Sequence, residues 1–223
     1  MSFFERLERE TAVERGALYA VPQILAGLSG EITREAYVAY LGEAYHHVSH
    51  TVPLLKAARD RMDAAHERFR AALDEYVEEE TGHEKWILND IRNAGGDADA
   101  VRDGPPGAAT ELMVAFAYDY VARVNPMGLF GMIYVLEGTS IALASHGAAA
   151  VARGLGLGPE CFSYLTSHGA LDQDHMKFFA GLMETVDDPL DQDAIVHVAK
   201  RVFGLFADVF RSIPLEARLA HAV

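Results

Sequence analysis

The sequence contains one cysteine, Cys161, among its 223 residues, so no disulfide can form within a single chain. We therefore expect a reducing, cytoplasmic location. Basic residues are also scarce: 19 Lys and Arg stand against 33 Asp and Glu, which gives a formal net charge of −14. Nucleic acids and anionic membranes are bound through basic patches, so this balance argues against both as partners.

Two kinds of segment are missing as well. No run of alternating apolar and polar residues rich in β-branched side chains stands out, so we expect little or no strand. The segment 1–16 is charged throughout and shows no secretory signal. There is no repeat, no low-complexity tract and no long linker, and 50% of the residues are hydrophobic. The sequence therefore predicts one domain over 1–223, with a single buried core.

Apolar residues recur at helical spacing almost everywhere, which predicts an all-α bundle of about seven helices. Several helix ends carry recognisable signals: Thr33 as an N-cap, proline after a capping residue at Asn125-Pro126 and Asp188-Pro189, and Gly95-Gly96 as a stop. We expect helices over 2–20, 33–65, 67–93, 108–124, 126–153, 167–186 and 189–212, with a short turn of helix over 159–166.

The most apolar segment, Met127–Ala152, is long enough to suggest a membrane span. It carries Glu137 and His146, however, which are costly in lipid, together with several glycines and small polar residues. A helix at the centre of a bundle explains it better, and we expect no membrane partner.

The stretch SHGALDQDHMKFF contains His168, Asp172 and His175 at positions i, i+4 and i+7. On an α-helix these offsets place the three side chains within an arc of roughly 60°. Two imidazoles and a carboxylate on one face can hold a divalent first-row metal and leave coordination positions open. Because the chain has ten histidines, the triplet can also arise by chance.

Two further clusters carry donors of the same kind. Glu80 and His83 are spaced i, i+3, and Glu79 and His83 are spaced i, i+4, so either pair shares a helix face; the alternative is an exposed acidic stretch. Glu137 lies in the most apolar segment, where a carboxylate must be hydrogen-bonded, protonated or bound to a metal. Together the clusters predict a shell of oxygen and nitrogen donors for two metal ions: Glu80, His83, Glu137, His168, Asp172 and His175, with Glu79 as an alternative ligand.

In this order (Glu-x-x-His, a lone Glu, then His-x-x-x-Asp-x-x-His) the sequence resembles the haem-oxygenase-like di-iron oxidases. These iron-containing redox enzymes form a branch of the superfamily that includes thiaminase-II-like proteins and the pyrroloquinoline-quinone synthase. The resemblance covers nearly the whole chain, and its last motif is the more specific one. In the family an acidic ligand can also lie seven positions before the first histidine, where this chain has Tyr76.

The resemblance implies a haem-oxygenase-like bundle, usually a homodimer, that holds two iron ions, or manganese, and no haem. It implies an oxidase or oxygenase that uses O₂ on a small organic substrate: an amine, an amino acid or a fatty acid. It also places pocket residues on the second helix, where His46 and His50 share a face. Tyr76 and Tyr134 are further candidates for the pocket, and Trp86 is expected to pack beside the metals. No residue is assigned a catalytic acid or base role.

Three alternatives remain open on the same scaffold. A metal-free, thiaminase-II-like hydrolase would need Cys161 as its nucleophile, although the connecting segment is a poor position for it. A haem protein would use His46 or His47 as the proximal ligand, with Gly128 and Gly131 on the opposite helix. A non-enzymatic metal-binding helical protein would bind metal without consuming O₂.

Overall fold

The computed structural model describes residues 2–215, apart from the side chains of residues 168–174. Within that range every regular element is a helix, which confirms the all-α prediction. The helices are α1 (Phe3–Glu10), α2 (Ala12–Tyr19), α3 (Pro22–Ser29), α4 (Arg34–Val48), α5 (Thr51–Arg61), α6 (Glu67–Glu80), α7 (Glu84–Asn93), α8 (Ala98–Asp103), α9 (Ala108–Arg123), α10 (Leu129–Leu155), α11 (Ser163–Met183) and α12 (Pro189–Ser212). Three short 3₁₀ turns, η1 (Ala64–His66), η2 (Pro126–Gly128) and η3 (Pro159–Cys161), connect some of them.

The described residues form twelve α-helices rather than the seven expected, because three of the long predicted helices are broken and the short helices α3 and α8 were not predicted. The first breaks at Thr11, whose hydroxyl donates to the carbonyl of Leu7 at 2.7 Å. The second breaks after Val48, where Pro53 in the following turn has no N–H to continue the hydrogen-bond ladder. The third breaks at Gly82, whose φ of +98° is a left-handed conformation that glycine adopts at little cost.

The predicted capping signals are confirmed, whereas α11 begins at Ser163, four residues before the predicted start, and ends at Met183 rather than at 186. The Thr33 hydroxyl accepts a hydrogen bond from the N–H of Ala36, and Asn125 and Asp188 cap the elements that begin with Pro126 and Pro189. Helix α7 ends at Asn93, and Gly95 follows with a φ of +86°.

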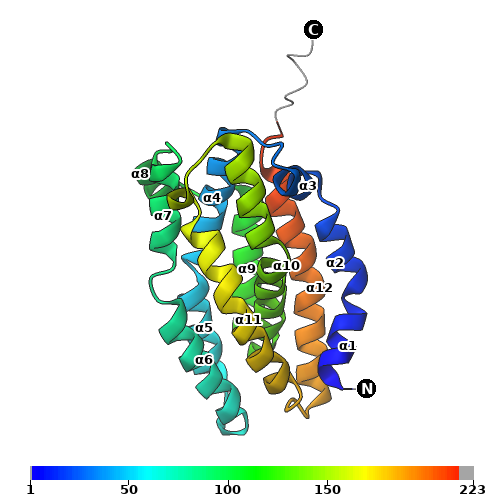
Figure 1. Ribbon diagram of the computed structural model, residues 1–223. Helices are drawn as coiled ribbons and strands as arrows, with labels where there is room; N and C mark the ends of the chain where they lie inside the picture. The colour runs from blue at the N-terminus through cyan, green and yellow to red at the C-terminus, as the bar shows by residue number, and fades with distance from the viewer. Residues whose placement is uncertain (1, 216–223) are drawn as a thin grey trace.

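Helix α10 lies in the middle of the bundle and packs against α11, α12 and α3 (Figure 1). Helices α1 and α2 run along α12 on one side, and α4–α8 cover the opposite side (Figure 1). Among the described helices, only the segment Pro126–Leu155 is long and apolar enough to cross a membrane, and 61% of it is buried inside the bundle. It is thus the central helix that the sequence predicts.

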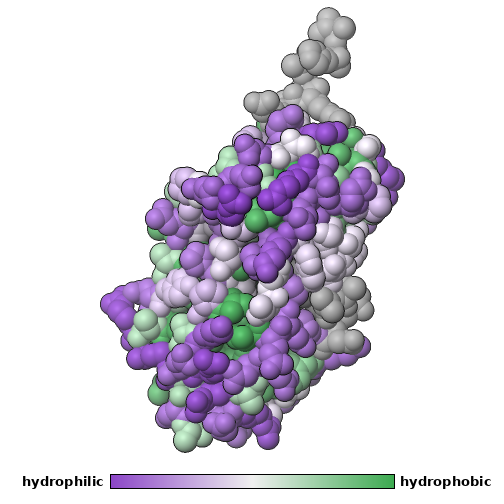
Figure 2. All heavy atoms as spheres, turned by 90° about the vertical axis from the view of Figure 1, so that its left-hand side faces the viewer, coloured by the Kyte–Doolittle hydropathy of each residue, from purple (hydrophilic) through white to green (hydrophobic). Residues whose placement is uncertain are grey.

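The core is divided into two clusters. The larger one joins α10, α11 and α12 to α5, α6 and α9, while the smaller lies between α4, α7 and η3. Figure 2 shows the face over α5–α8, where hydrophilic side chains predominate and hydrophobic ones form small separate areas.

Close backbone contacts set the position of α10 against α12. A Cβ atom added to Gly131 would lie 2.3 Å from the carbonyl oxygen of Ile195 and 2.7 Å from the amide nitrogen of Ala199. Gly128 is equally tight against Val198 and Tyr120. These are the two glycines that suggested a haem-facing helix, and their close approach to α12 and α9 accounts for them through helix packing.

Candidate metal centre

The candidate donors come from three places: the α6–α7 junction, the middle of α10 and the middle of α11. Glu80 is the last residue of α6, and His83 directly precedes α7. The expected continuous helix between them is therefore wrong, because Gly82 ends α6 with its left-handed backbone. The pair nevertheless meets: Nδ1 of His83 lies 3.1 Å from Oε2 of Glu80, with side chains only 8% and 10% exposed.

The ring of His83 also stacks on an aromatic side chain. It stacks on the indole of Trp86, with the ring centroids 4.1 Å apart and an interplanar angle of 22°. Trp86 therefore packs beside the candidate site, where the sequence places it.

The second pair joins the central helix to α11. Nδ1 of His175 lies 3.9 Å from Oε1 of Glu137, and each side chain is 12% exposed. Nε2 of the same imidazole lies 2.9 Å from Oε2 of Glu79, which is 52% exposed. The imidazole of His175 is thus held between two carboxylates, a buried one on α10 and a largely exposed one at the end of α6.

Tyr76 lies against this second pair. Its ring meets that of His175 edge-on at a centroid distance of 5.8 Å and also contacts Phe178. The tyrosine is 3% exposed, so its ring covers part of the His175 imidazole on the α6 side.

The remaining two predicted ligands, His168 and Asp172, lie outside the described residues. Among the described side chains, no three His, Cys, Asp or Glu groups lie close enough together to hold a metal ion. The predicted metal shell therefore depends on those two residues and stays a prediction.

A buried carboxylate fixes the start of α11, the helix that carries three of the candidates. Asp90, on α7, accepts hydrogen bonds from the amides of Ser163 and Tyr164 at 3.0 and 2.8 Å and from the Ser163 hydroxyl at 2.6 Å. Burial raises the pKa of Asp90, and these hydrogen bonds oppose that rise. The same contacts join α7, next to His83, to α11.

A cavity of about 150 Å³ lies between α3, α4, α10, α11 and α12. Its described lining includes His47, whereas His46 borders an open groove beside Glu43 and His50 contacts the Tyr118 hydroxyl at 3.1 Å. Neither of the two predicted pocket histidines lies on this cavity, because α4 presents the next residue, rotated by about 100° from His46, toward its interior.

Tyr134 is not among the described residues that line the cavity either. Its hydroxyl accepts a hydrogen bond from Arg15 at 2.7 Å, and its ring stacks on Phe179. It is a core tyrosine with a satisfied hydroxyl, which the sequence also allows. The sequence analysis did not identify Thr139 and Ser140, which lie two and three residues after Glu137 and line the cavity.

Cys161 is an unfavourable nucleophile. It is 1% exposed, it does not line the cavity, and burial raises the pKa of its thiol. A thiol in such surroundings stays protonated and unreactive.

Comparison with known proteins identifies a matching protein family. The sequence profile of a family described as "Iron-containing redox enzyme" matches residues 38–206. No curated protein matches the chain.

Solved structures share the fold at low sequence identity. A domain of unknown function with a haem oxygenase-like fold from Shewanella denitrificans OS217 is 24% identical, with a TM-score of 0.85 over 94% of this chain and 90% of that one. A TenA homologue from P. horikoshii OT3 is 9% identical, with a TM-score of 0.78 over 95% and 97%. Haem oxygenase-1 from Synechocystis sp. PCC 6803, solved with haem, is 13% identical, with a TM-score of 0.75 over 95% and 91%. The haem-oxygenase-like fold is therefore confirmed.

Proposed function

Because the chain belongs to the iron-containing redox enzyme family, we propose that it is a non-haem iron enzyme that uses O₂ to oxidise a small organic substrate. The observation that carries this proposal is the meeting of Glu137 with His175 across the α10–α11 contact. A carboxylate on the most apolar helix is costly to bury unless its charge is matched, and a bound cation would match it.

The donors present suit iron or manganese. Two buried pairs, Glu80 with His83 and Glu137 with His175, each combine a carboxylate oxygen with an imidazole nitrogen, and no thiolate is among them. This mixed set disfavours structural zinc and accepts either iron or manganese. With His168 and Asp172 from α11, it would supply six ligands for two ions.

Glu79 has a different role in this proposal. It lies at Nε2 of His175, the nitrogen opposite the one that faces Glu137. A metal-binding histidine usually donates its other N–H to a carboxylate, which fixes the tautomer and the orientation of the ring. Glu79 would therefore orient His175, and Glu80 would be the ligand.

When bound, the metal would supply the redox chemistry with O₂. The protein's own side chains hold the donors in place and exclude water: Tyr76 covers the α6 side and Trp86 stacks on His83. We further propose that the enzyme acts as a cytoplasmic homodimer, with a small molecule and O₂ as its partners and without nucleic acid, membrane or haem.

Metal loading tests the proposal. The full-length protein is treated with Fe(II) without oxygen, desalted, and its iron measured by elemental analysis. We expect about two iron ions per chain, and fewer than about one would refute the proposed centre. His175→Ala should lose most of the iron, whereas His146→Ala, which removes an exposed histidine of the same central helix, should retain it.

The alternatives give different results in the same samples. Metal uptake without O₂ consumption under any substrate would indicate a metal-binding protein that is not an enzyme. A Soret band on titration with haemin would indicate haem binding. Pyrimidine hydrolysis that is lost in Cys161→Ser would indicate a thiaminase-like hydrolase.

A further inference from the structure

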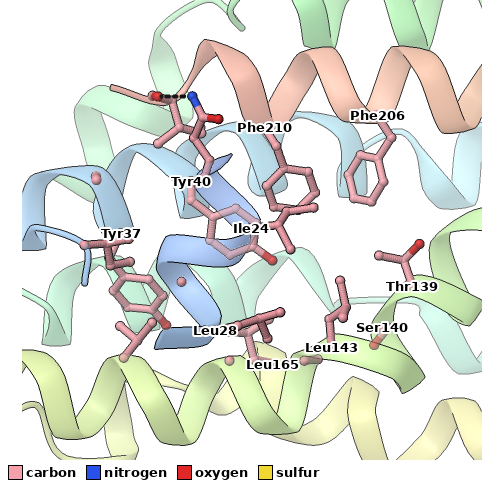
Figure 3. Close-up of a pocket in the computed structure, with 18 of the residues that line it drawn as sticks. Ile24, Leu28, Tyr37, Tyr40, Thr139, Ser140, Leu143, Leu165, Phe206 and Phe210 are labelled. Atoms are coloured by element: carbon pink, nitrogen blue, oxygen red, sulfur yellow. Dashed lines mark hydrogen bonds between the residues drawn. The ribbon is translucent and has the colours of Figure 1, made fainter. Parts of the chain in front are cut away.

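The cavity between α3, α4, α10, α11 and α12 has an aromatic wall and an aliphatic wall. Tyr40 and Phe210 stack at a centroid distance of 5.6 Å, and Phe206 meets Phe210 edge-on at 4.9 Å. Figure 3 shows these rings on one side of the cavity, with Leu28, Leu143 and Leu165 on the other. An apolar ligand body fits between the two walls.

The described lining of the cavity contains no Asp, Glu, Lys or Arg. Burial raises the pKa of Tyr37 and of Tyr40, so both phenols are neutral at physiological pH. The Tyr37 hydroxyl is already committed, because it donates to the carbonyl of Cys161 at 2.7 Å. His47 is the one imidazole in this lining. Placing an ion here without an opposite charge would cost several kcal/mol.

One end of the cavity is polar. The hydroxyl oxygens of Thr139 and Ser140 are buried there. The Tyr19 phenol interacts with the Thr139 hydroxyl, whereas the Ser140 hydroxyl has no hydrogen-bond partner among the described residues. A buried hydroxyl left unsatisfied costs about 1–3 kcal/mol, which a polar group of a ligand would recover.

These hydroxyls are also close in sequence to the candidate metal centre. Thr139 and Ser140 follow Glu137 within one turn of α10 but point about 200° and 300° round the helix axis from it, so the cavity and Glu137 lie on different faces of the helix. The volume of about 150 Å³ corresponds to a molecule the size of one benzene ring, since an apolar cavity of about that volume is known to bind benzene.

We propose that this cavity binds a small neutral molecule with an apolar body about the size of one six-membered ring and one hydroxyl or carbonyl group, which hydrogen-bonds to Thr139 and Ser140. The proposal goes beyond the proposed function and does not depend on it, because none of the described candidate metal ligands lines this cavity. It excludes carboxylates, amino acids and ammonium ions as the preferred class.

Four probes that differ at one position test the class: 4-methylphenol, toluene, 4-methylbenzoate and 4-methylbenzylamine. Each is titrated into the metal-free full-length protein at neutral pH by calorimetry. We expect 4-methylphenol to bind about threefold to tenfold more tightly than toluene, which is what one neutral hydrogen bond contributes. Both ions should bind at least about tenfold more weakly than 4-methylphenol. Tighter binding of the benzoate, for instance through His47, would overturn the proposal.

Substitutions in the cavity test whether the probes bind there. Thr139→Val with Ser140→Ala should reduce 4-methylphenol affinity to that of toluene and leave toluene unchanged. Gly147→Leu should abolish binding of all probes, because Gly147 lines the cavity and the nearest side chain to an added Cβ is Leu28 at 3.9 Å. Gly204→Leu is the matched control, on an exposed helical position with open space around it. Unchanged binding in Gly147→Leu would place the probes elsewhere and refute the proposal.

The outcome is separable from that of the iron experiment, since neither readout requires the other. Selective 4-methylphenol binding without iron uptake would leave the cavity assignment standing and remove the oxidase. Iron uptake without probe selectivity would leave the metal centre standing and refute the proposed ligand class of the cavity. Circular dichroism of each variant shows whether a loss of binding reflects unfolding, and the wild-type probe series does not depend on any variant.

Discussion

Replacing Gly131 with alanine should destabilise the bundle, although alanine is the better helix former. The added Cβ would lie 2.3 Å and 2.7 Å from two backbone atoms of α12, which cannot move aside as the end of a flexible side chain can. Overpacking a core typically costs about 1–3 kcal/mol, and contacts with backbone belong at the upper end. Alanine returns about 1 kcal/mol of helix propensity, so we expect a net loss of about 2 kcal/mol.

The matched control is Gly204→Ala, on an exposed part of α12 with nothing within 4 Å of the added Cβ. It should stabilise the protein by about 0.5–1 kcal/mol, because only the propensity changes. Thermal and urea unfolding, followed by circular dichroism, measure both variants. For a domain of this size, the midpoint of Gly131→Ala should fall by about 4–8 °C and that of Gly204→Ala should rise by about 2–4 °C. If the two variants shift together, the close α10–α12 contact does not exist as described.

Three further predictions concern charged groups. Burial lowers the pKa of His66, but hydrogen bonds and charge from Asp191 and Asp63 outweigh it, so the pKa is raised in the folded protein. The stabilisation that His66 provides is therefore complete below its unfolded pKa and is lost as pH rises through its folded pKa. In urea unfolding, the stability difference between wild type and His66→Gln should shrink as the pH rises, and a growing difference would contradict this sign. Asp90→Ala should lower the free energy of unfolding by about 1–2 kcal/mol and weaken iron binding, because it releases the start of α11. An unchanged unfolding midpoint would show that these hydrogen bonds contribute nothing to stability. Glu79→Gln should weaken Fe(II) binding about 10–100-fold, because Glu79 orients His175. The control is Glu78→Gln, at the neighbouring exposed position. Equal affinities in the two variants would show that Glu79 does not orient His175.

Local signals were readable from the sequence because they act within a few residues. Thr33, Asn125 and Asp188 cap their helices through side-chain bonds to amides two or three residues ahead, and that pattern is visible without a structure. The meeting of His175 with Glu137 could be proposed because a buried carboxylate on an apolar helix needs a partner.

Other features depended on information that the sequence spreads over distant segments. Glycine tolerates both helical and left-handed backbone, so the break at Gly82 could not be distinguished from a continuous helix. Helix α4 has apolar and aromatic residues on several faces, which hid the choice of His47 over His46 for the cavity. The cavity itself is formed by five helices, and no local pattern reports which of their side chains converge.

The three faces of α10 explain why its sequence mixes glycine, hydroxyl and carboxylate residues in an otherwise apolar segment. At about 100° per residue, Gly131, Glu137 and Leu143 lie about 120° apart around the helix axis. The first allows close contact with α12, the second meets α11, and the third lines the cavity. Because the middle of this helix has little solvent-facing surface, every polar group on it needs a specific partner. His175 is near Glu137 and the Tyr19 phenol is near Thr139, whereas Ser140 has no hydrogen-bond partner among the described residues, so this unmet hydrogen-bonding capacity of the central helix lies in the cavity.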